Sequence, residues 1–157
     1  MGLRVLSSEF FALLGVLVAF YALYVERRKA LDASYEALCD TQSFSCTKVL
    51  MSEYGHILSK WGLVKEGSAL DVPNPILGLA FYAVVLARAP LGLPRDLVVA
   101  ASLGSLLFSV YLAWVLYAVL HDFCVVCVSS YVCNAAIFAF EVRAAGKARA
   151  AAKAKGA

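Results

Sequence analysis

The sequence contains four long stretches without a charged side chain, at residues 10–25, 72–87, 97–120 and 123–140. A helix needs roughly 20 apolar residues to cross the hydrocarbon core of a bilayer. The third and fourth stretches are long enough as they stand, and flanking apolar residues lengthen the first two. This pattern predicts an all-α membrane protein, a bundle of four transmembrane helices at about 8–27, 73–91, 96–120 and 123–143.

The composition argues against buried helices of a soluble protein. Hydrophobic residues make up 62% of the 157-residue chain and charged residues 16%, whereas a soluble domain is about half apolar and a quarter charged. The first stretch also suits a signal peptide, but "ERRKALDASY" after it lacks a clean small-residue cleavage site. We therefore expect a retained first helix and a single membrane domain over residues 1–157.

The largest segment outside the predicted helices is a loop over residues 28–72. Within it, "CTKVLMSEYGHILSKWGLV" (46–64) has apolar residues three or four positions apart. That spacing predicts a short amphipathic helix that lies on the membrane or over the mouth of the bundle. An ordinary packed surface helix fits the same pattern. At the other end of the chain, residues 144–157 are predicted to form a tail rich in alanine, lysine and arginine.

Counting four spans places the cysteines relative to the bilayer. Both termini lie on one side, and the 28–72 loop and the turn at His121 and Asp122 lie on the other. Four cysteines are therefore expected at the same face: Cys39, Cys46, Cys124 and Cys127.

The distribution of lysine and arginine predicts which face this is. The tail and the short loop between the second and third helices are basic, and short basic segments stay in the cytosol. The basic "ERRK" after the first helix argues the other way. The C-terminal "KAKGA" resembles a di-lysine retrieval signal of the endoplasmic reticulum. We expect a multi-pass protein of the endoplasmic reticulum membrane with both termini cytosolic and the four cysteines lumenal.

Four chemistries compete for these cysteines. A tetrahedral zinc site would use four thiolates, but Cys39 and Cys46 are too far apart for a usual knuckle. Haem attachment would require a histidine after "CVVC", where Val128 stands. Structural disulfides remain an alternative, although the short loop between Cys124 and Cys127 removes little entropy from the unfolded chain. Redox catalysis suits this spacing best. The dipole at a helix start favours a thiolate, whereas Asp122 and burial in an apolar site oppose it.

Further polar groups follow this pair along the fourth helix. Tyr131 lies four residues after Cys127 and Asn134 three further, so a thiol, a phenol and an amide share one face. These groups suit a lipophilic carbonyl compound. Cys133 points elsewhere and is expected to be an inert buried thiol. A buried dithiol with a second pair in the loop has the layout of an electron relay that works by thiol–disulfide exchange.

Several longer motifs resemble the vitamin K epoxide reductase family over nearly the whole chain. They are "YEALCD" (35–40) with "SC" (45–46), "NPILG" followed by "FY" (74–82), and "SVYLAWVLYAVLHDFCVVC" running into "SSYVCN" (109–134). The resemblance implies a four-helix bundle around a quinone pocket, capped by the lumenal loop and its short helix. It is weakest over "EYGHILSKWGLVKEGSALDV" (53–72), which would form part of the cap.

The family resemblance also implies roles for the cysteines. Cys127 would attack the substrate, and Cys124 would resolve the adduct and leave a disulfide between the two. Cys46 would then attack Cys124. Finally, Cys39 would resolve that bond and exchange with a thioredoxin-like lumenal protein, the electron donor.

Two polar side chains are implied to orient the substrate. Asn74 and Tyr131 would hydrogen-bond the two carbonyl oxygens of a naphthoquinone and polarise them as charge develops. Taken alone, Asn74 also suits a residue that starts or caps the second helix, and Tyr131 suits an interfacial anchor or a contact between helices. The apolar walls of the pocket would include four residues: Leu50, Phe81, Tyr82 and Leu112.

Three functions are compatible with these residues. The first is an enzyme that reduces vitamin K 2,3-epoxide to the quinone and on to the hydroquinone with protein thiols, inhibited by coumarin compounds of the warfarin type. The second is a quinone-linked oxidase that forms disulfides for protein folding by running the relay in reverse. The third is a membrane protein whose cysteines only staple the loop. Without a Gly-rich phosphate motif or a metal-ligand cluster in the sequence, we expect no bound nicotinamide, flavin or metal, and no nucleic-acid partner.

Overall fold

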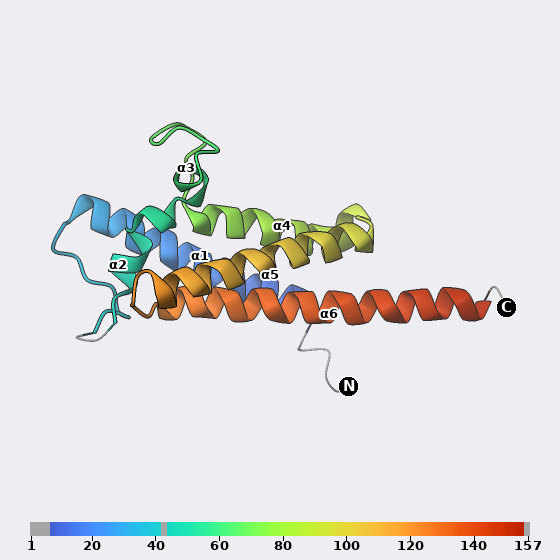
Figure 1. The fold of residues 1–157 in the computed structure, drawn as a ribbon. Helices are drawn as coiled ribbons and strands as arrows, with labels where there is room; N and C mark the ends of the chain where they lie inside the picture. The colour runs from blue at the N-terminus through green and yellow to red at the C-terminus, as the bar shows by residue number, and fades with distance from the viewer. Residues whose placement is uncertain (1–6, 42–43, 156–157) are drawn as a thin grey trace.

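The computed structural model describes residues 7–41 and 44–155, which form helices and connecting segments without a strand. Four helices are long and apolar enough to cross a membrane: α1 (Ser8–Leu31), α4 (Asn74–Leu91), α5 (Arg95–Ala118) and α6 (Val125–Lys155). Figure 1 shows them alongside one another, with short helical segments toward one end of the bundle. The predicted fold class, an all-α membrane protein with four transmembrane helices, is confirmed.

Two of the long helices extend beyond the ends that the hydrophobic pattern indicates. The pattern places the end of α1 near residue 27 and that of α6 near 143, whereas the helices continue to Leu31 and Lys155 (Figure 1). Residues 144–155 are mostly alanine, lysine and arginine, which are strong helix formers. The described part of the predicted tail is therefore a helical extension of α6, and residues 156–157 lie outside the described residues.

Short connections join consecutive helices of the bundle. Residues 92–94 join α4 to α5, and Gly92 has a φ of 62°, a left-handed conformation that glycine adopts without strain. Residues 119–124 join α5 to α6 and contain the predicted turn at His121 and Asp122. Because both connections are short, α4, α5 and α6 must run back and forth beside one another.

Small residues let α1 approach its neighbours closely. Ala12, Gly15, Ala19 and Ala22 are buried at spacings of three or four, which puts them on one face of the helix. The ring of Tyr82 on α4 lies directly over Gly15, so that a side chain at this glycine would collide with the ring. Such close packing stabilises helices inside a membrane, where lipid is as apolar as the side chains.

A group of charged and polar residues ties all four long helices together at the end that carries the termini. Glu141 of α6 is only 1% exposed. Its carboxylate accepts a hydrogen bond from Ser8 of α1 at 2.5 Å and another from Arg95 of α5 at 3.1 Å. Arg88 of α4 lies 4.0 Å from Glu141 and 3.5 Å from Glu9. We call these five residues the Glu141 cluster.

The segment 46–64 forms three short helical pieces rather than one amphipathic helix, which corrects that prediction. They are α2 (Cys46–Leu50), the 3-10 helix η1 (Glu53–Gly55) and α3 (Ile57–Lys60), and we call them together the cap. The chain breaks at Ser52, whose backbone is extended with φ −72° and ψ 162°. It then turns so tightly that a side chain at Gly55 would collide with the carbonyl oxygen of Leu50. A single helix over this segment cannot make that turn.

The Glu141 cluster generates a prediction about stability. Glu141→Leu removes the carboxylate and leaves Ser8, Arg88 and Arg95 without their shared partner. Removing one member of a buried ion pair costs about 3 kcal/mol or more, which corresponds to a fall in Tm of roughly 10 °C. Thermal unfolding of the detergent-solubilised protein, followed by tryptophan fluorescence, measures this change.

Arg149→Ala provides the matched control, because it removes an ion pair at 2.8 Å between two exposed side chains, Arg149 and Asp96. Exposed pairs contribute at most about 1 kcal/mol, so its Tm should stay close to that of the wild type. Equal Tm values for the two variants would show that the Glu141 cluster does not hold the bundle together.

Candidate active site

Four of the five cysteines form two disulfides. Cys124, directly before α6, is bonded to Cys127 in its first turn, with the Cα atoms 5.2 Å apart. The backbone N–H of Cys127 also donates to Cys124 Sγ at 3.2 Å. In the loop, Cys39 is bonded to Cys46, with the Cα atoms 6.0 Å apart. Cys133 is a free, buried thiol, as its position in the sequence predicts.

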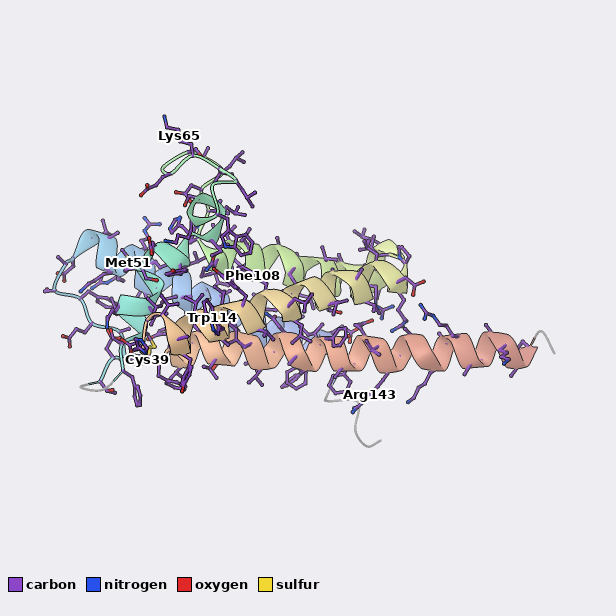
Figure 2. All side chains as sticks on the ribbon, in the orientation of Figure 1. Cys39, Met51, Lys65, Phe108, Trp114 and Arg143 are labelled. Atoms are coloured by element: carbon purple, nitrogen blue, oxygen red, sulfur yellow. A yellow bond between two sulfur atoms is a disulfide. The ribbon has the colours of Figure 1, made fainter. Side chains whose placement is uncertain are left out.

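The two disulfides lie in one packed cluster. Cys46 and Cys124 are fully buried within it, together with apolar side chains from α1, α2, α5 and α6. Cys39 and Cys127 pack against its edge and are partly exposed. Figure 2 shows sulfur atoms near Cys39, where the loop meets the start of α6. In each pair, one cysteine is therefore fully buried and the other is partly exposed.

Asp122 connects the loop to the start of α6 through hydrogen bonds and an ion pair. Its carboxylate accepts hydrogen bonds from the backbone N–H of Ser45 at 3.0 Å and of Phe123 at 2.8 Å, and it pairs with Lys48 at 3.2 Å. Partial burial raises the pKa of Asp122, but these hydrogen bonds and the Lys48 charge more than offset it and hold the pKa below its ordinary value. Ser45 directly precedes a loop cysteine, so Asp122 positions one disulfide beside the other.

Asp40 organises the loop disulfide in a similar way. It accepts hydrogen bonds from the backbone N–H of Ala37 at 2.8 Å and of Thr47 at 3.0 Å, and from the hydroxyl groups of Thr47 and Ser45. Burial alone raises the pKa of Asp40, yet these donors bring it below its ordinary value. Asp40 lies within 4.8 Å of the sulfurs of Cys39 and Cys46. Because those sulfurs are bonded to one another and the carboxylate is engaged, the three side chains fit a structural loop better than a metal site.

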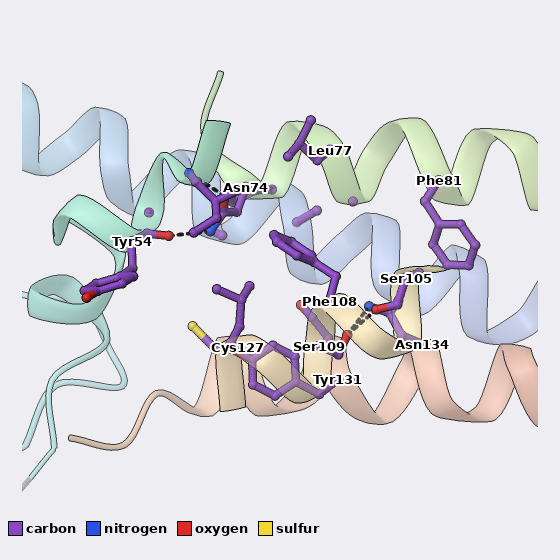
Figure 3. Close-up of a pocket in the computed structure, with 18 of the residues that line it drawn as sticks. Tyr54, Asn74, Leu77, Phe81, Ser105, Phe108, Ser109, Cys127, Tyr131 and Asn134 are labelled. Carbon is purple, nitrogen blue, oxygen red and sulfur yellow. Dashed lines mark hydrogen bonds between the residues drawn. The ribbon is translucent and has the colours of Figure 1, made fainter. Parts of the chain in front are cut away.

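An apolar cavity of about 570 Å³ lies between the cap and the four long helices (Figure 3). Its lining includes all of the residues that the sequence predicts around a substrate, three with polar groups and four apolar: Cys127, Asn74, Tyr131, Leu50, Phe81, Tyr82 and Leu112. Cys39, Cys46 and Cys124 are not part of its wall. Of the two disulfides, only the Cys124–Cys127 bond therefore meets the cavity, through Cys127.

Asn74 connects the cap to the bundle. It is the first residue of α4, but the N-cap of that helix is Pro73. Instead, its amide N–H donates to the carbonyl of Tyr54 at 2.6 Å, and its oxygen accepts from the backbone N–H of Ile57 at 3.2 Å. An amide has two N–H donors and two lone pairs on oxygen. Among the described residues, one of each has no protein partner, and Asn74 lines the cavity (Figure 3).

The predicted polar face of α6 also meets the cavity. Cys127, Tyr131 and Asn134 all line it, which confirms that the three share one face. Within residues 7–41 and 44–155, the Tyr131 hydroxyl has no hydrogen-bond partner. The Asn134 amide donates to Ser109 at 2.8 Å, while its oxygen is buried without a partner. The cavity wall thus offers hydrogen-bonding groups that no protein atom uses.

From the cap, sequence reasoning predicted only Leu50 in the cavity wall, and it missed the other residues that the cap and α1 add. Trp61, at the end of α3, packs against Phe108 and donates to the Tyr111 hydroxyl at 3.3 Å. These two contacts hold the cap against α5. Both Trp61 and Phe108 line the cavity. Glu26 of α1 lines it too. In the sequence, Glu26 follows Ala22 by four residues and Ala19 by seven. This helical spacing places Glu26 on the small-residue face of α1 and could have located it at the cavity.

This arrangement limits the chemistry of the site. A cavity of this size holds a small apolar molecule, and its amide and hydroxyl groups can hydrogen-bond carbonyl oxygens. A dithiol in its wall can deliver two electrons to that molecule, and a second pair behind it can restore the dithiol by exchange. The fold and the site define a membrane-embedded thiol–disulfide oxidoreductase.

Comparison with known proteins identifies the family. The model of the vitamin K epoxide reductase family matches residues 9–142. Vitamin K epoxide reductase complex subunit 1 of Mus musculus is 40% identical over 132 residues, which cover 78% of this chain and 78% of the mouse protein. The Rattus norvegicus protein of the same name is 38% identical over 135 residues, or 80% of each chain. The chain belongs to the vitamin K epoxide reductase family of oxidoreductases.

The hydrogen bonds of Asp122 and Asp40 predict how stability depends on pH. The pKa of each carboxyl lies below the ordinary aspartate value of 3.8. The stability they contribute is therefore complete above that value and is lost as the pH falls through the lower pKa of the folded protein. We expect the Tm to fall as the pH is lowered from 5 toward about 2, and to fall less steeply in Asp122→Asn.

Asp96→Asn, at the opposite end of the bundle, is the control and should keep the wild-type pH dependence. Thermal unfolding in detergent over this pH range measures all three proteins. An Asp122→Asn curve parallel to that of the wild type would contradict the role given to Asp122.

Proposed function

We propose that this enzyme reduces vitamin K 2,3-epoxide to the quinone, and the quinone to the hydroquinone, with electrons from its own cysteines. The observation that supports this most directly is that Cys127, Asn74 and Tyr131 line one apolar cavity. A naphthoquinone has an apolar body and two carbonyl oxygens, which suit the apolar walls, the second amide N–H and the unpartnered hydroxyl. The names of the mouse and rat relatives include vitamin K epoxide reductase.

Cys127 is the sulfur that reacts with the substrate in this proposal, because Cys127 lines the cavity and Cys124 is fully buried. In the reduced enzyme the Cys127 thiolate attacks the substrate, and Cys124 then attacks Cys127 and forms the disulfide. The quinone and two thiols give the hydroquinone and a disulfide. The epoxide and two thiols give the quinone, water and a disulfide. Asn74 and Tyr131 stabilise the charge that develops on the carbonyl oxygens.

The loop pair restores the dithiol. Cys46 attacks Cys124, a step supported by the burial of both sulfurs in one cluster. Cys39, partly exposed at the edge of that cluster, then resolves the bond and exchanges with a thioredoxin-like protein. The relay runs from the partly exposed Cys39 in the loop, through the buried Cys46 and Cys124, to Cys127 in the cavity wall.

The cavity also accounts for the expected ligands. Leu50, Phe81, Tyr82 and Leu112 contact the quinone ring and its side chain in this proposal. A coumarin is a flat apolar compound with oxygen acceptors, so inhibitors of the warfarin type compete for the same walls and hydrogen-bond donors. Because protein thiols supply the electrons, the reaction requires no permanently bound metal, flavin or nicotinamide.

We place the cap in the lumen of the endoplasmic reticulum and both termini in the cytosol. The basic extension of α6 favours the cytosol for its end of the bundle, and an oxidising lumen suits two disulfides. The basic residues that follow the first hydrophobic stretch are compatible with a lumenal position because they have local roles. Lys29 donates to the carbonyl groups of Ala33 and Tyr35 at 2.7 and 2.9 Å, and Arg28 lies over the Tyr35 ring.

An assay of vitamin K epoxide reduction by the solubilised protein with dithiothreitol tests this proposal. Cys127→Ser should reduce turnover to background, because no second sulfur lines the cavity among the described residues. Cys39→Ser should keep turnover with dithiothreitol, which reduces the cavity pair directly, and lose turnover driven by a thioredoxin-like protein. The readout is the quinone formed, separated by chromatography.

Cys133→Ser is the matched control, since Cys133 is a free thiol on the same helix, and it should behave as wild type. Absence of turnover in folded wild-type protein would contradict the proposal. It would favour either the disulfide-forming oxidase, detected as quinone-dependent oxidation of a reduced protein, or cysteines that only staple the loop and resist mild reduction.

A further inference from the structure

Glu26 is a carboxyl group in the wall of the cavity. It lies in the last two turns of α1, four residues after Ala22 and seven after Ala19, which line the same cavity. Among the described lining residues, Glu26 is the one Asp, Glu, Lys or Arg side chain. Its Oε1 is buried and has no hydrogen-bond partner within the described part of the chain. Neither the cysteine relay nor the groups proposed to orient the quinone use it.

A structural role does not explain this carboxyl. Glu141, the other glutamate inside the bundle, is fully engaged by Ser8 and Arg95. Within the described residues Glu26 Oε1 has no such partner, and an ionised carboxylate buried without partners is costly. A carboxylic acid in the same place carries a proton that it can donate to a molecule in the cavity. Reduction of a quinone or an epoxide consumes protons at oxygen, and a positioned acid accelerates such a step.

His56 of the cap can carry a proton between the cavity and water. It lies between η1 and α3, flanked by Gly55 and Ile57, which line the cavity together with Glu26. Its Nδ1–H donates to the Asp71 carboxylate at 3.2 Å, and its side chain is 42% exposed. The basic neighbours of Glu26 on α1 are turned to the loop and the surface. The remaining titratable groups in the wall are uncharged: Tyr54, Tyr82, Tyr131 and the disulfide-bonded Cys127.

We propose that Glu26 is the proton donor of the cavity, and that His56, held by Asp71, returns the proton from water. This deepens the proposed function and rests on it. When Cys127 reacts as a thiolate, its proton has already been released to water. Glu26 supplies the equivalent proton to the quinone or epoxide oxygen while the Cys124–Cys127 bond forms. The Cys124 thiol gives up the second proton as it attacks Cys127. Two electrons leave the two sulfurs, two protons reach the substrate, and His56 then returns a proton from water to Glu26.

A single-turnover measurement isolates this step. The protein is reduced, freed of dithiothreitol and mixed with vitamin K quinone, and hydroquinone formation is followed by fluorescence as a function of pH. Glu26→Gln keeps the size and polarity of the side chain but removes the acid, and should slow the turnover about 10²-fold. Glu26→Asp should recover part of the rate. In the wild type the rate should fall at high pH as the acid loses its proton, and this limb should be absent from Glu26→Gln.

Glu36→Gln, an exposed carboxyl of the loop, is the matched control and should keep the wild-type rate and pH profile. Tm and the number of reducible thiols report whether each variant is folded. A folded Glu26→Gln protein with the wild-type rate and pH profile overturns the inference, and so does a slow variant that keeps the wild-type pH limb. If the wild type itself makes no hydroquinone, the proposed function fails, and the proton donor with it.

Discussion

The hydrogen bond between the Ser45 N–H and the Asp122 carboxylate is the contact on which the site depends. It joins the loop to the turn before α6, two segments that are far apart in the sequence. A loop of this length is costly to order, and apolar packing alone does not fix its register. The Asp122 carboxylate fixes this register, and the loop disulfide and the cavity disulfide therefore lie in one packed cluster. The ion pair between Lys48 and Asp122 at 3.2 Å and the contact between the Phe44 and Phe123 rings support the same junction.

Each end of the bundle contains a glutamate in its interior, and the two glutamates differ in their hydrogen bonding. Away from the cap, Glu141 is buried but satisfied, and it holds all four long helices in place. Beneath the cap, Glu26 lines an apolar cavity, and its Oε1 has no partner in the described part of the chain. The contacts of Glu141 hold the long helices together, whereas Glu26 remains available to act as an acid in the proposed reaction. The sulfur and the phenol at the cavity come from α6, the amide from α4 and the carboxyl from α1, so their mutual positions depend on the packing of these helices.

Much of this was predictable from the sequence, for identifiable physical reasons. Membrane helices follow from long apolar runs, and the shared face of Cys127, Tyr131 and Asn134 follows from helical spacing. The breaks in the cap were not predictable, because they depend on the tight approach of Gly55 to the Leu50 carbonyl. Nor were the partners of Asn74, which lie in a segment with little resemblance to the family. The sequence contains Glu26, but only the folded cavity shows that it lacks a partner.

The central claim is that Cys127 delivers electrons to a quinone in this cavity. The most direct test is to mix pre-reduced Cys124→Ser protein with vitamin K quinone and to locate any covalent adduct by mass spectrometry. Without Cys124 the adduct cannot be resolved, so we expect it to accumulate on Cys127 and to leave the buried Cys133 unmodified. Absence of an adduct and of any new absorbance band, or an adduct found mainly on another cysteine, would rule out Cys127 as the sulfur that reacts with the quinone.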